Sequence, residues 1–424
     1  MLSSLRERWA AVSVAHTVAP AADALRSGLL VGALALLALV GTDGSGAWQL
    51  TRVVLVAFAT AGALLASRAG GRWAIAVWCA GAVHVVMGVG IGLRHLQVAG
   101  LVWRGVVGTA ELLAGFLVLG ALAAATLGPR SWPRRILLAP LPFVALVLVG
   151  WCTVPAVMAT NVPPIDADND VPTALGPTAV DVRFPAADGT ELAAWWVPPA
   201  NGHVVVVRHG ASSTRGDAVD EAAVLVDAGY GVLVTDARGH GASGGRAMDF
   251  GWWGDADVTA AVAYVAAQPG VDGEHVGLLG LSMGAEEAIG AAPAIPSVAA
   301  VVAEGATARD AVDKTWMRDE YGAGGWVQSL LDLPTFGLTD LLTDAPRPTP
   351  LVDAVGDAGA HFLVIAAGEE PDEAQVAERL AAAAPDRVET WVVDGAPHTG
   401  GLATDPAGWT QRVLAFLDAT LAPA

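Results

Sequence analysis

Residues 275–287 read HVGLLGLSMGAEE, and this stretch decides how the second half of the chain folds. An apolar run typical of a buried strand leads into Gly-x-Ser-x-Gly at 280–284, and a helix-like run follows from Ala285. A strand, a sharp turn and a helix in that order predict a strained turn with Ser282 at its tip and the hydroxyl exposed. Glycines at 280 and 284 let the strand and the helix approach closely. The pattern alone is weak in a chain with 50 glycines, so its context carries the prediction.

Composition divides the chain into two unlike parts. The 424 residues are 54% hydrophobic with a mean hydropathy of +0.51, which predicts a membrane part. Residues 1–160 hold 11 Arg against 4 acidic residues, a net charge of +7. Residues 161–424 hold 12 Lys and Arg against 38 Asp and Glu, a net charge of −26. The acidic part should repel nucleic acid, so no nucleic-acid partner is expected.

The first 160 residues predict a bundle of membrane-spanning helices. Five apolar runs reach or approach the roughly 20 residues that cross a bilayer. They are Ser27–Gly41, Val53–Ala66, Trp73–Leu93, Val106–Leu127 and Ile136–Ala159. With a cytoplasmic N-terminus, eight arginines fall in inside segments and three in outside loops, which is the usual bias. Five spans then place the C-terminal domain outside the cytoplasm, in a multi-pass protein of the cell membrane.

Two ionisable residues, His84 and Glu111, fall inside these apolar runs. Ionisable groups are costly in a membrane, so they indicate either a proton or ligand site, or a pair that hydrogen-bonds to itself. A linker rich in Pro and Asp, 161–177, follows the membrane region, 1–160. The acidic domain then occupies 178–424.

The acidic domain alternates strand-like and helix-like runs. A hairpin is predicted first, with strands Val180–Phe184 and Glu191–Val197. Further strands are predicted at His203–Arg208, Gly231–Thr235, His275–Leu279, Ala299–Ala303, Phe362–Ala366 and Val388–Val393. Helices are predicted at Ala218–Ala228, Asp255–Ala267, Asp372–Ala384 and Ala407–Leu421. This alternation implies one doubly wound, mostly parallel sheet with helices on its faces.

Four segments make this domain resemble the α/β-hydrolase family. They are Arg208–Ala211, Asp236–Ser243, the turn around Ser282, and Gly395–His398. The opening hairpin and the run D-x-R-G-H-G-x-S are similar to the membrane-anchored and serine-aminopeptidase-like branches of that family. The resemblance covers roughly 178–422 and implies an α/β-hydrolase fold, preceded here by an all-α transmembrane bundle.

The resemblance gives Ser282 the role of nucleophile and His398 the role of its base. A serine hydroxyl is unreactive until a base takes its proton, and imidazole titrates near working pH. His398 follows the last predicted strand, where this fold delivers its histidine.

The acid of the triad is less sharply indicated. The family pattern places it after the strand Phe362–Ala366, three residues after a glycine, but that position is Pro371 in this chain. Asp372 is the first choice. The alternatives that remain are Glu370, Glu369 and, at the end of the preceding strand, Glu304. One buried carboxylate is needed to orient the imidazole and stabilise its cation.

Two backbone N–H groups should stabilise the oxyanion, and the resemblance implies those of Met283 and Ala211. His209 and His240 lie in loop motifs of this fold, where histidines hold the backbone by hydrogen bonds, so no metal is predicted. No cofactor is implied. Residues 305–350 are long for a connection between strands and contain apolar and aromatic side chains, which favours a cap over the site.

The expected activity is that of a membrane-anchored serine hydrolase acting on an ester, thioester or amide through an acyl-serine intermediate. Esterase or lipase-like activity is the first choice and a peptidase the second, with a small-molecule or lipid-like acyl substrate. The alternative is a membrane transport or sensing protein whose hydrolase-like domain only binds a ligand. The oligomeric state is left open by the sequence.

Overall fold

The computed structural model describes residues 21–39, 46–69, 74–128, 130–163 and 170–421. Its Cα atoms group into two units. The helical unit is Met1–Pro163 with Gly337–Asp344, and the α/β unit is Pro164–Phe336 with Ala345–Ala424. Several residues of the sequence predictions lie outside the described ranges: linker residues 164–169 and the expected helix ends Gly41 and Trp73. So do three of the eight arginines counted in inside segments, which are Arg6, Arg8 and Arg72.

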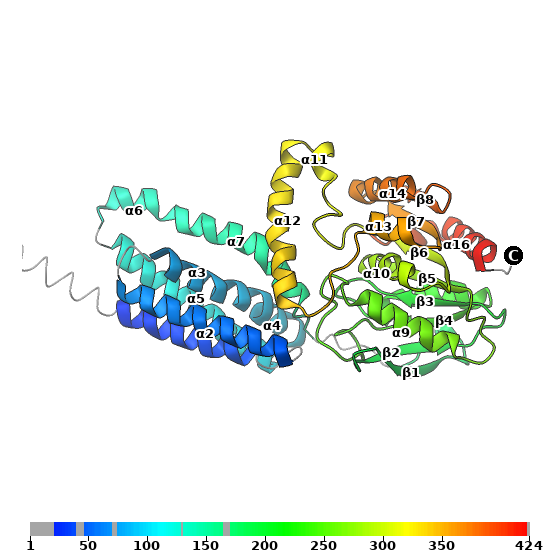
Figure 1. The fold of residues 1–424 in the computed structure, drawn as a ribbon, viewed down its shortest axis with the longest axis horizontal. Coiled ribbons are helices and arrows are strands. Elements are labelled where there is room, and N and C mark those ends of the chain that lie inside the picture. The colour runs from blue at the N-terminus through cyan, green and yellow to red at the C-terminus, as the bar shows by residue number, and fades with distance from the viewer. Residues whose placement is uncertain (1–20, 40–45, 70–73, 129, 164–169, 422–424) are drawn as a thin grey trace, which may run out of the picture. The chain divides into compact units, whose positions relative to one another are not determined.

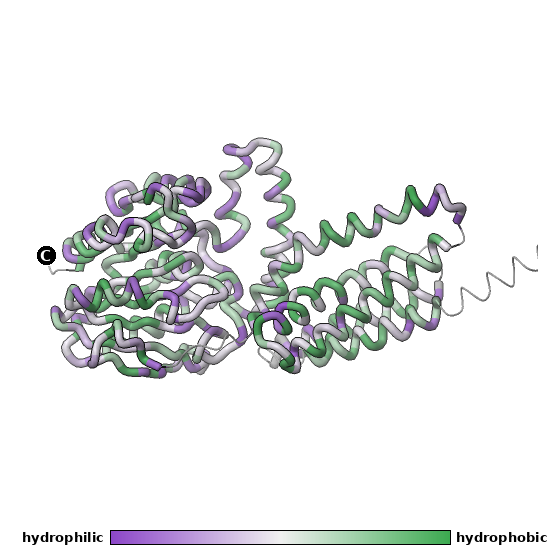
Figure 2. The backbone as a smooth tube through the Cα atoms, turned by 180° about the vertical axis from the view of Figure 1, so that it is seen from behind, coloured by the Kyte–Doolittle hydropathy of each residue, from purple (hydrophilic) through white to green (hydrophobic). Residues whose placement is uncertain are grey.

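Five helices of the helical unit are long and apolar enough to cross a membrane by length and composition. They are Ala21–Leu39, Gln49–Arg68, Ala74–Ala99, Trp103–Leu127 and Trp132–Ala159. The five apolar runs of the sequence are thus confirmed as long helices, and Figure 2 shows hydrophobic residues along them. Each helix extends beyond its apolar run at one end or both, because residues outside the runs are also helical.

Within these helices the structure distinguishes shorter elements, labelled in Figure 1. They are α2 (Gly46–Ala69), α3 (Ala74–Met87), α4 (Arg94–Ala99), α5 (Trp103–Leu127), α6 (Trp132–Leu138) and α7 (Pro140–Ala159). A π-helical segment, Gly88–Leu93, joins α3 to α4 without a break.

Glycines bring α3 and α5 into close contact around the two ionisable residues. A Cβ atom on Gly88 would lie 2.5 Å from the backbone of Leu112, so no larger residue fits there. His84 Nδ1 and Glu111 Oε1 are 2.7 Å apart and both side chains are buried. A Cβ atom on Gly32 would lie 2.7 Å from the imidazole of His84. The interpretation of His84 and Glu111 as a mutually hydrogen-bonded pair is therefore confirmed.

The α/β unit is built on one eight-stranded sheet in the order β1-β2-β4-β3-β5-β6-β7-β8. The strands are β1 (Val180–Pro185), β2 (Glu191–Val197), β3 (Val204–Arg208), β4 (Gly231–Thr235), β5 (Val276–Leu281), β6 (Val298–Glu304), β7 (His361–Ala367) and β8 (Val388–Val393). β2 pairs antiparallel with β1 and β4, and every pairing from β4 to β8 is parallel. The predicted strands, hairpin and sheet are confirmed, with ends that differ by one or two residues.

Helices cover both faces of this sheet, as a doubly wound fold requires. One face packs against α9 (Gly254–Ala266), α10 (Met283–Ala291), α13 (Leu351–Asp357) and α14 (Pro371–Ala383). The other face packs against α8 (Val219–Asp227) and α16 (Pro406–Leu421). The central strands read as unbroken apolar runs because both of their faces are buried: all five residues of β3 are inaccessible.

The connection between β6 and β7 holds α11 (Met317–Glu320) and α12 (Ala323–Leu342). The sequence assigns this whole connection to the acidic domain, but the structure groups Gly337–Asp344 with the helical unit. Leu338 and Leu342 of α12 pack against a cluster of that unit, and Arg52 donates a hydrogen bond to the Leu342 carbonyl. The C-terminal end of α12, from Gly337, is therefore part of the helical unit.

Candidate active site

Ser282 sits on the sharp turn between β5 and α10. Its backbone has φ 54° and ψ −120°, a left-handed conformation that is strained for a residue with a side chain. A Cβ atom on Gly284 would lie 2.6 Å from the carbonyl oxygens of Arg208 and His209, so the turn passes β3 too closely for any other residue. The Ser282 N–H donates to the Glu304 carbonyl at 2.7 Å and fixes the turn to β6. The strand–turn–helix expected for Ser282 is thus confirmed.

The loop after β8 brings His398 to this serine, 116 residues away in the sequence. His398 Nε2 lies 2.8 Å from Ser282 Oγ, so the imidazole can accept the hydroxyl proton. Gly305, with φ +76°, lies beneath the ring. A Cβ atom on Gly305 would lie 3.0 Å from His398 Cε1. The expected pairing of Ser282 with His398 agrees with this geometry.

The carboxylate that contacts His398 is Glu373, which was not among the residues proposed from the sequence. Glu373 Oε1 lies 2.5 Å from His398 Nδ1, and Glu373 Oε2 accepts the Ala367 N–H at 2.8 Å. Its side chain is 3% exposed, against 44% for His398. Each carboxylate oxygen therefore has a donor, and the imidazole is held with Nδ1 protonated and Nε2 free to accept.

The choice of Asp372 as the acid is wrong, because Glu373 is the carboxylate that contacts His398, whereas the half-buried Asp372 accepts a hydrogen bond from Tyr321 Oη at 2.5 Å. Glu370 precedes α14 as its N-cap and is exposed, and Glu369 is exposed as well. Neither contacts His398.

Glu304 is buried near the triad but also does not contact His398. Its Oε1 accepts the Gly401 N–H at 2.7 Å and its Oε2 accepts Trp409 Nε1–H at 2.9 Å. Gly401 lies three residues after His398, so Glu304 ties the histidine loop to the end of β6. Burial raises the pKa of the Glu304 carboxyl above its usual range.

The sequence carried a signal for Glu373 in the pattern of α14. The buried residues of that helix are Glu373, Val376, Ala377 and Leu380, spaced as one face of a helix. Asp372 falls off this face and Glu373 falls on it. A search of the helix for a carboxylate on the apolar stripe, rather than of the loop for a fixed offset from Gly368, identifies Glu373.

The electrostatics of the site stabilise the charged form of the base. The hydrogen bond to Glu373 raises the pKa of His398, and the nearby charges of Glu370 and Glu286 act in the same direction, against the opposing effect of burial. Glu286 is itself held by three donors, the Thr307 N–H and hydroxyl and the Ala308 N–H. An imidazolium formed during a reaction would therefore be stabilised.

Two backbone N–H groups beside Ser282 have no acceptor among the described residues: those of Ala211 and Met283. Met283 opens α10, where backbone N–H groups lack partners within the helix. Ala211 follows Gly210, and a Cβ atom on Gly210 would lie 3.1 Å from Ser282 Cβ. Both N–H groups are therefore available as donors, and their role as the oxyanion hole stays a prediction.

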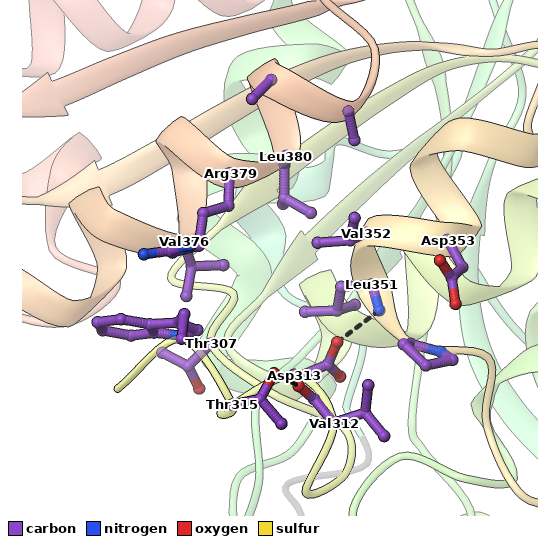
Figure 3. Close-up of a pocket in the computed structure, with 14 residues that line it drawn as sticks. Thr307, Val312, Asp313, Thr315, Leu351, Val352, Asp353, Val376, Arg379 and Leu380 are labelled. Carbon is purple, nitrogen blue, oxygen red and sulfur yellow. Dashed lines mark hydrogen bonds between the residues drawn. The ribbon is translucent and has the colours of Figure 1, made fainter. Parts of the chain in front are cut away.

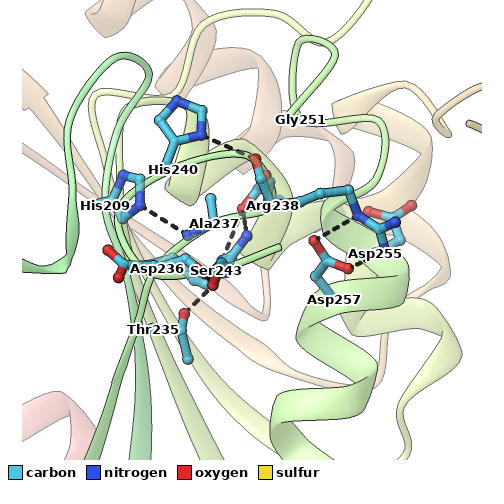
Figure 4. A network of polar contacts seen from close by, with 12 residues as sticks. His209, Thr235, Asp236, Ala237, Arg238, His240, Ser243, Gly251, Asp255 and Asp257 are labelled. Carbon is cyan, nitrogen blue, oxygen red and sulfur yellow. Dashed lines mark hydrogen bonds and ion pairs between the residues drawn. The ribbon is translucent and has the colours of Figure 1, made fainter. Parts of the chain in front are cut away.

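A polar network holds the loops beside the serine (Figure 4). His209 Nδ1–H donates to the Gly210 carbonyl at 2.7 Å, and His209 Nε2 accepts the Ala237 N–H at 2.9 Å. His240 Nδ1–H donates to the Arg238 carbonyl at 3.0 Å. Burial lowers the pKa of His240 to about 4 and lowers that of His209 well below its usual value. Both histidines are neutral braces of the backbone, as the sequence indicated.

A cavity of about 480 Å³ lies between α13, α14 and the loop after β6 (Figure 3). Asp313 is at its edge and accepts the Leu351 N–H at 2.7 Å, and burial raises the pKa of Asp313 to about 6. Ser282, His398 and Glu373 are not among the residues that line this cavity. It is therefore distinct from the triad, although α14 contributes to both.

Comparison with known proteins agrees with this architecture. Residues 199–333 match the model of the family described as Serine aminopeptidase, S33. Uncharacterized protein Rv2307c of Mycobacterium tuberculosis is 30% identical over 248 residues, which cover 58% of this chain and 81% of that protein. The Pyrococcus furiosus esterase Pf2001 is 26% identical with a TM-score of 0.49, covering 62% of this chain and 98% of that one. The chain belongs to the α/β-hydrolase family, with its hydrolase domain in the C-terminal part and an N-terminal region of five long apolar helices.

Proposed function

We propose that this protein is a serine hydrolase that transfers an acyl group to water through an acyl-serine intermediate. The supporting observation is the continuous hydrogen-bonded chain from Glu373 through His398 to Ser282. Glu373 contacts Nδ1 of the imidazole, which leaves Nε2 to take the proton from Ser282 Oγ. Serine, acid and histidine also follow one another along the chain in the order usual for this fold.

Acylation uses each of these groups once. Ser282 Oγ bonds to the acyl carbon while its proton moves to His398 Nε2, and the carbonyl electron pair moves onto the oxygen. The N–H groups of Ala211 and Met283 stabilise that oxyanion. When the carbonyl re-forms, the bond to the leaving group breaks, and His398 gives the proton to the leaving group. Glu373 stays ionised and stabilises the imidazolium.

Deacylation repeats these steps with water. His398 takes a proton from the water as its oxygen bonds to the acyl carbon. The second oxyanion occupies the same two N–H groups. Collapse breaks the bond to Ser282 Oγ, which recovers its proton from His398, and the carboxylic acid leaves.

Esters and thioesters, including lipid-like ones, are the first substrate class. The part of α12 that belongs to the α/β unit exposes Trp326, Leu330 and Leu333 on one side, which provides an apolar surface within the expected cap. A peptidase is the second class, and the name of the matched family favours it. Glu370 is exposed at the N-cap of α14, three residues before Glu373, and its negative charge would attract a substrate ammonium group.

We place the protein in the cell membrane, crossing it with the five apolar helices. The arginine distribution favours a cytoplasmic N-terminus and therefore a hydrolase domain on the outer side. Accessibility of a cysteine introduced at Asp227, in the α/β unit, to an impermeant maleimide in intact cells tests this orientation. Labelling only after the cells are permeabilised would reverse it.

The test of the activity is labelling of the detergent-purified protein with a fluorophosphonate, followed by identification of the modified peptide. We expect an adduct on Ser282 that is lost in Ser282→Ala and His398→Ala and kept in Ser297→Ala, a serine outside the triad. Absence of an adduct in folded protein would refute the catalytic function and favour a ligand-binding domain. Matched p-nitrophenyl esters and aminoacyl p-nitroanilides then separate esterase from aminopeptidase activity.

A further inference from the structure

The last long helix of the helical unit is buried only near its C-terminal end. The buried residues of α7 are Ala156 and Val157, close to its C-terminus. There, a Cβ atom on Gly90 would lie 2.5 Å from Val157 Cγ1, so the helices are in tight contact. The rest of α6 and α7 is exposed or half-exposed, and Figure 1 shows this pair running apart from α3 and α5.

A groove of about 700 Å³ fills the opening between α6–α7 and the helices α3 and α5. Its walls are almost wholly apolar, with large side chains such as Trp78, Phe116, Leu119, Leu138, Leu141 and Phe143. Along α5 the lining runs from Phe116 to Leu127, roughly 17 Å at the rise of an α-helix. That length is about one leaflet of a hydrocarbon core of ~30 Å.

One end of the groove is basic. Arg130 is the only charged residue among those that line it, and Arg134 and Arg135 follow on α6 and are exposed. Arg135 donates to the carbonyls of Arg130 and Gly128, which fixes the turn that carries the three guanidinium groups. In the sequence, no Asp or Glu occurs between residues 112 and 165. Within the described ranges no carboxylate pairs with these arginines, so their charge is uncompensated.

We propose that this groove is a binding site for one anionic phospholipid, with an acyl chain along α5 and the phosphate at Arg130 and Arg134. Guanidinium groups match phosphate geometry, and basic pockets between membrane helices are suited to anionic headgroups. The site rests on insertion of the five helices into a membrane and is independent of the hydrolase reaction.

The orientation inferred from the arginines places this end of the groove at the cytoplasmic surface. The cytoplasmic leaflet is the one that carries a negative surface potential from anionic lipids. The occupant is therefore a lipid of the inner leaflet, on the side of the membrane opposite to the proposed site of hydrolysis.

Two glycines provide a matched pair of variants. Gly120 lines the groove, whereas Gly62 of α2 is not among its lining residues. At either position an added Cβ atom would meet no atom within 4 Å. Gly120→Phe therefore fills the groove without disturbing helix packing, and Gly62→Phe adds the same side chain elsewhere. Arg130→Gln with Arg134→Gln removes the charge, and Arg68→Gln, at the end of α2, is its control.

The experiment is native mass spectrometry of the detergent-purified full chain, titrated with phosphatidylglycerol or with phosphatidylcholine of the same acyl chains. We expect one phosphatidylglycerol to bind about tenfold more tightly than phosphatidylcholine, with roughly fivefold lost for each arginine removed. Gly120→Phe should abolish this site, whereas Gly62→Phe and Arg68→Gln should retain it.

Three outcomes would overturn the proposal. Equal binding of the two lipids would show ordinary annular lipid. Unchanged binding in Gly120→Phe would place the lipid outside the groove, even if the arginine variant lost affinity. Dimers that Gly120→Phe dissociates would show a second copy of the chain in the groove.

Discussion

Replacement of Glu373 by Gln tests the assignment of the triad acid most directly. Both oxygens of Glu373 accept hydrogen bonds, one from His398 Nδ1–H and one from the Ala367 N–H. A glutamine has one oxygen and one NH₂, so one of the two donors must face another donor. If the NH₂ group faces His398, the ring must keep its proton on Nε2, and it can no longer accept the proton of Ser282.

The expected loss in kcat/KM is about 10³- to 10⁴-fold, as for removal of the charged acid in other triads. That loss corresponds to about 4–5.5 kcal/mol of transition-state stabilisation. The assay is steady-state hydrolysis of a p-nitrophenyl ester, with Asp372→Asn as the matched control. Asp372 is half-buried, bonded to Tyr321 and not in contact with His398, so its variant should retain nearly full activity. A loss below tenfold in Glu373→Gln, or an equal loss in both variants, would refute this assignment.

The pH profile adds an independent readout. Only neutral His398 can act as the base, so activity should rise with pH as the imidazolium loses its proton. Because Glu373 raises the pKa of His398, the midpoint of that rise should lie above the ordinary value of about 6.5. Removing the carboxylate charge should move the midpoint to lower pH. A midpoint that stays in place would show that Glu373 does not interact with the base.

Three further predictions concern the support of the site. Gly305→Ala should lower the free energy of unfolding by about 1–2 kcal/mol because Gly305 has a positive φ, and should also lower kcat because the new methyl group meets the triad histidine. Gly176 has φ +80° but lies in open space, so Gly176→Ala should lower only the stability measured by thermal unfolding. Glu287→Gln should cost about 3–5 kcal/mol in denaturant unfolding, because it leaves the buried charge of Arg208 unpaired. Burial raises the pKa of Glu221 to about 7, so the stability that its neutral carboxyl contributes is fully present below pH 4.5 and is lost as the pH rises through 7. Glu221→Gln should therefore unfold at a higher temperature than the parent protein at pH 8 and at the same temperature at pH 4.

Most of the hydrolase fold could be predicted because its signals are local. Strands buried on both faces read as unbroken apolar runs, and the turn around Ser282 needs glycines at fixed positions. The placement of Gly337–Asp344 could not be predicted in this way. The segment belongs to one helix, α12, and only its contacts with distant residues show that it packs in the helical unit.

The serine and the histidine were predictable, whereas the acid was not, for a geometric reason. Ser282 directly follows the end of β5, and His398 lies in the short loop that follows β8, so the sheet places both. The acid lies within the first turn of a helix, where adjacent residues point about 100° apart and an offset of one residue changes the direction of the side chain. The longer side chain of Glu373 then reaches back from the helix to the imidazole, so a rule calibrated on a loop position fails.

The helical unit is built as a folded domain, beyond what anchoring requires. A single helix of about 20 apolar residues suffices to hold a domain at a membrane. This unit instead has helices packed so closely that Gly88 and Gly115 admit no side chain, and it buries the pair His84 and Glu111, which is costly in hydrocarbon. Such packing fixes the shape of the bundle. A fixed shape is also what keeps the exposed part of α6–α7 apart from α3 and α5, since the buried residues of α7 are confined to Ala156 and Val157. The open groove is thus a consequence of rigid packing at one end of α7, and a site for a lipid gives that rigidity a use that anchoring alone does not.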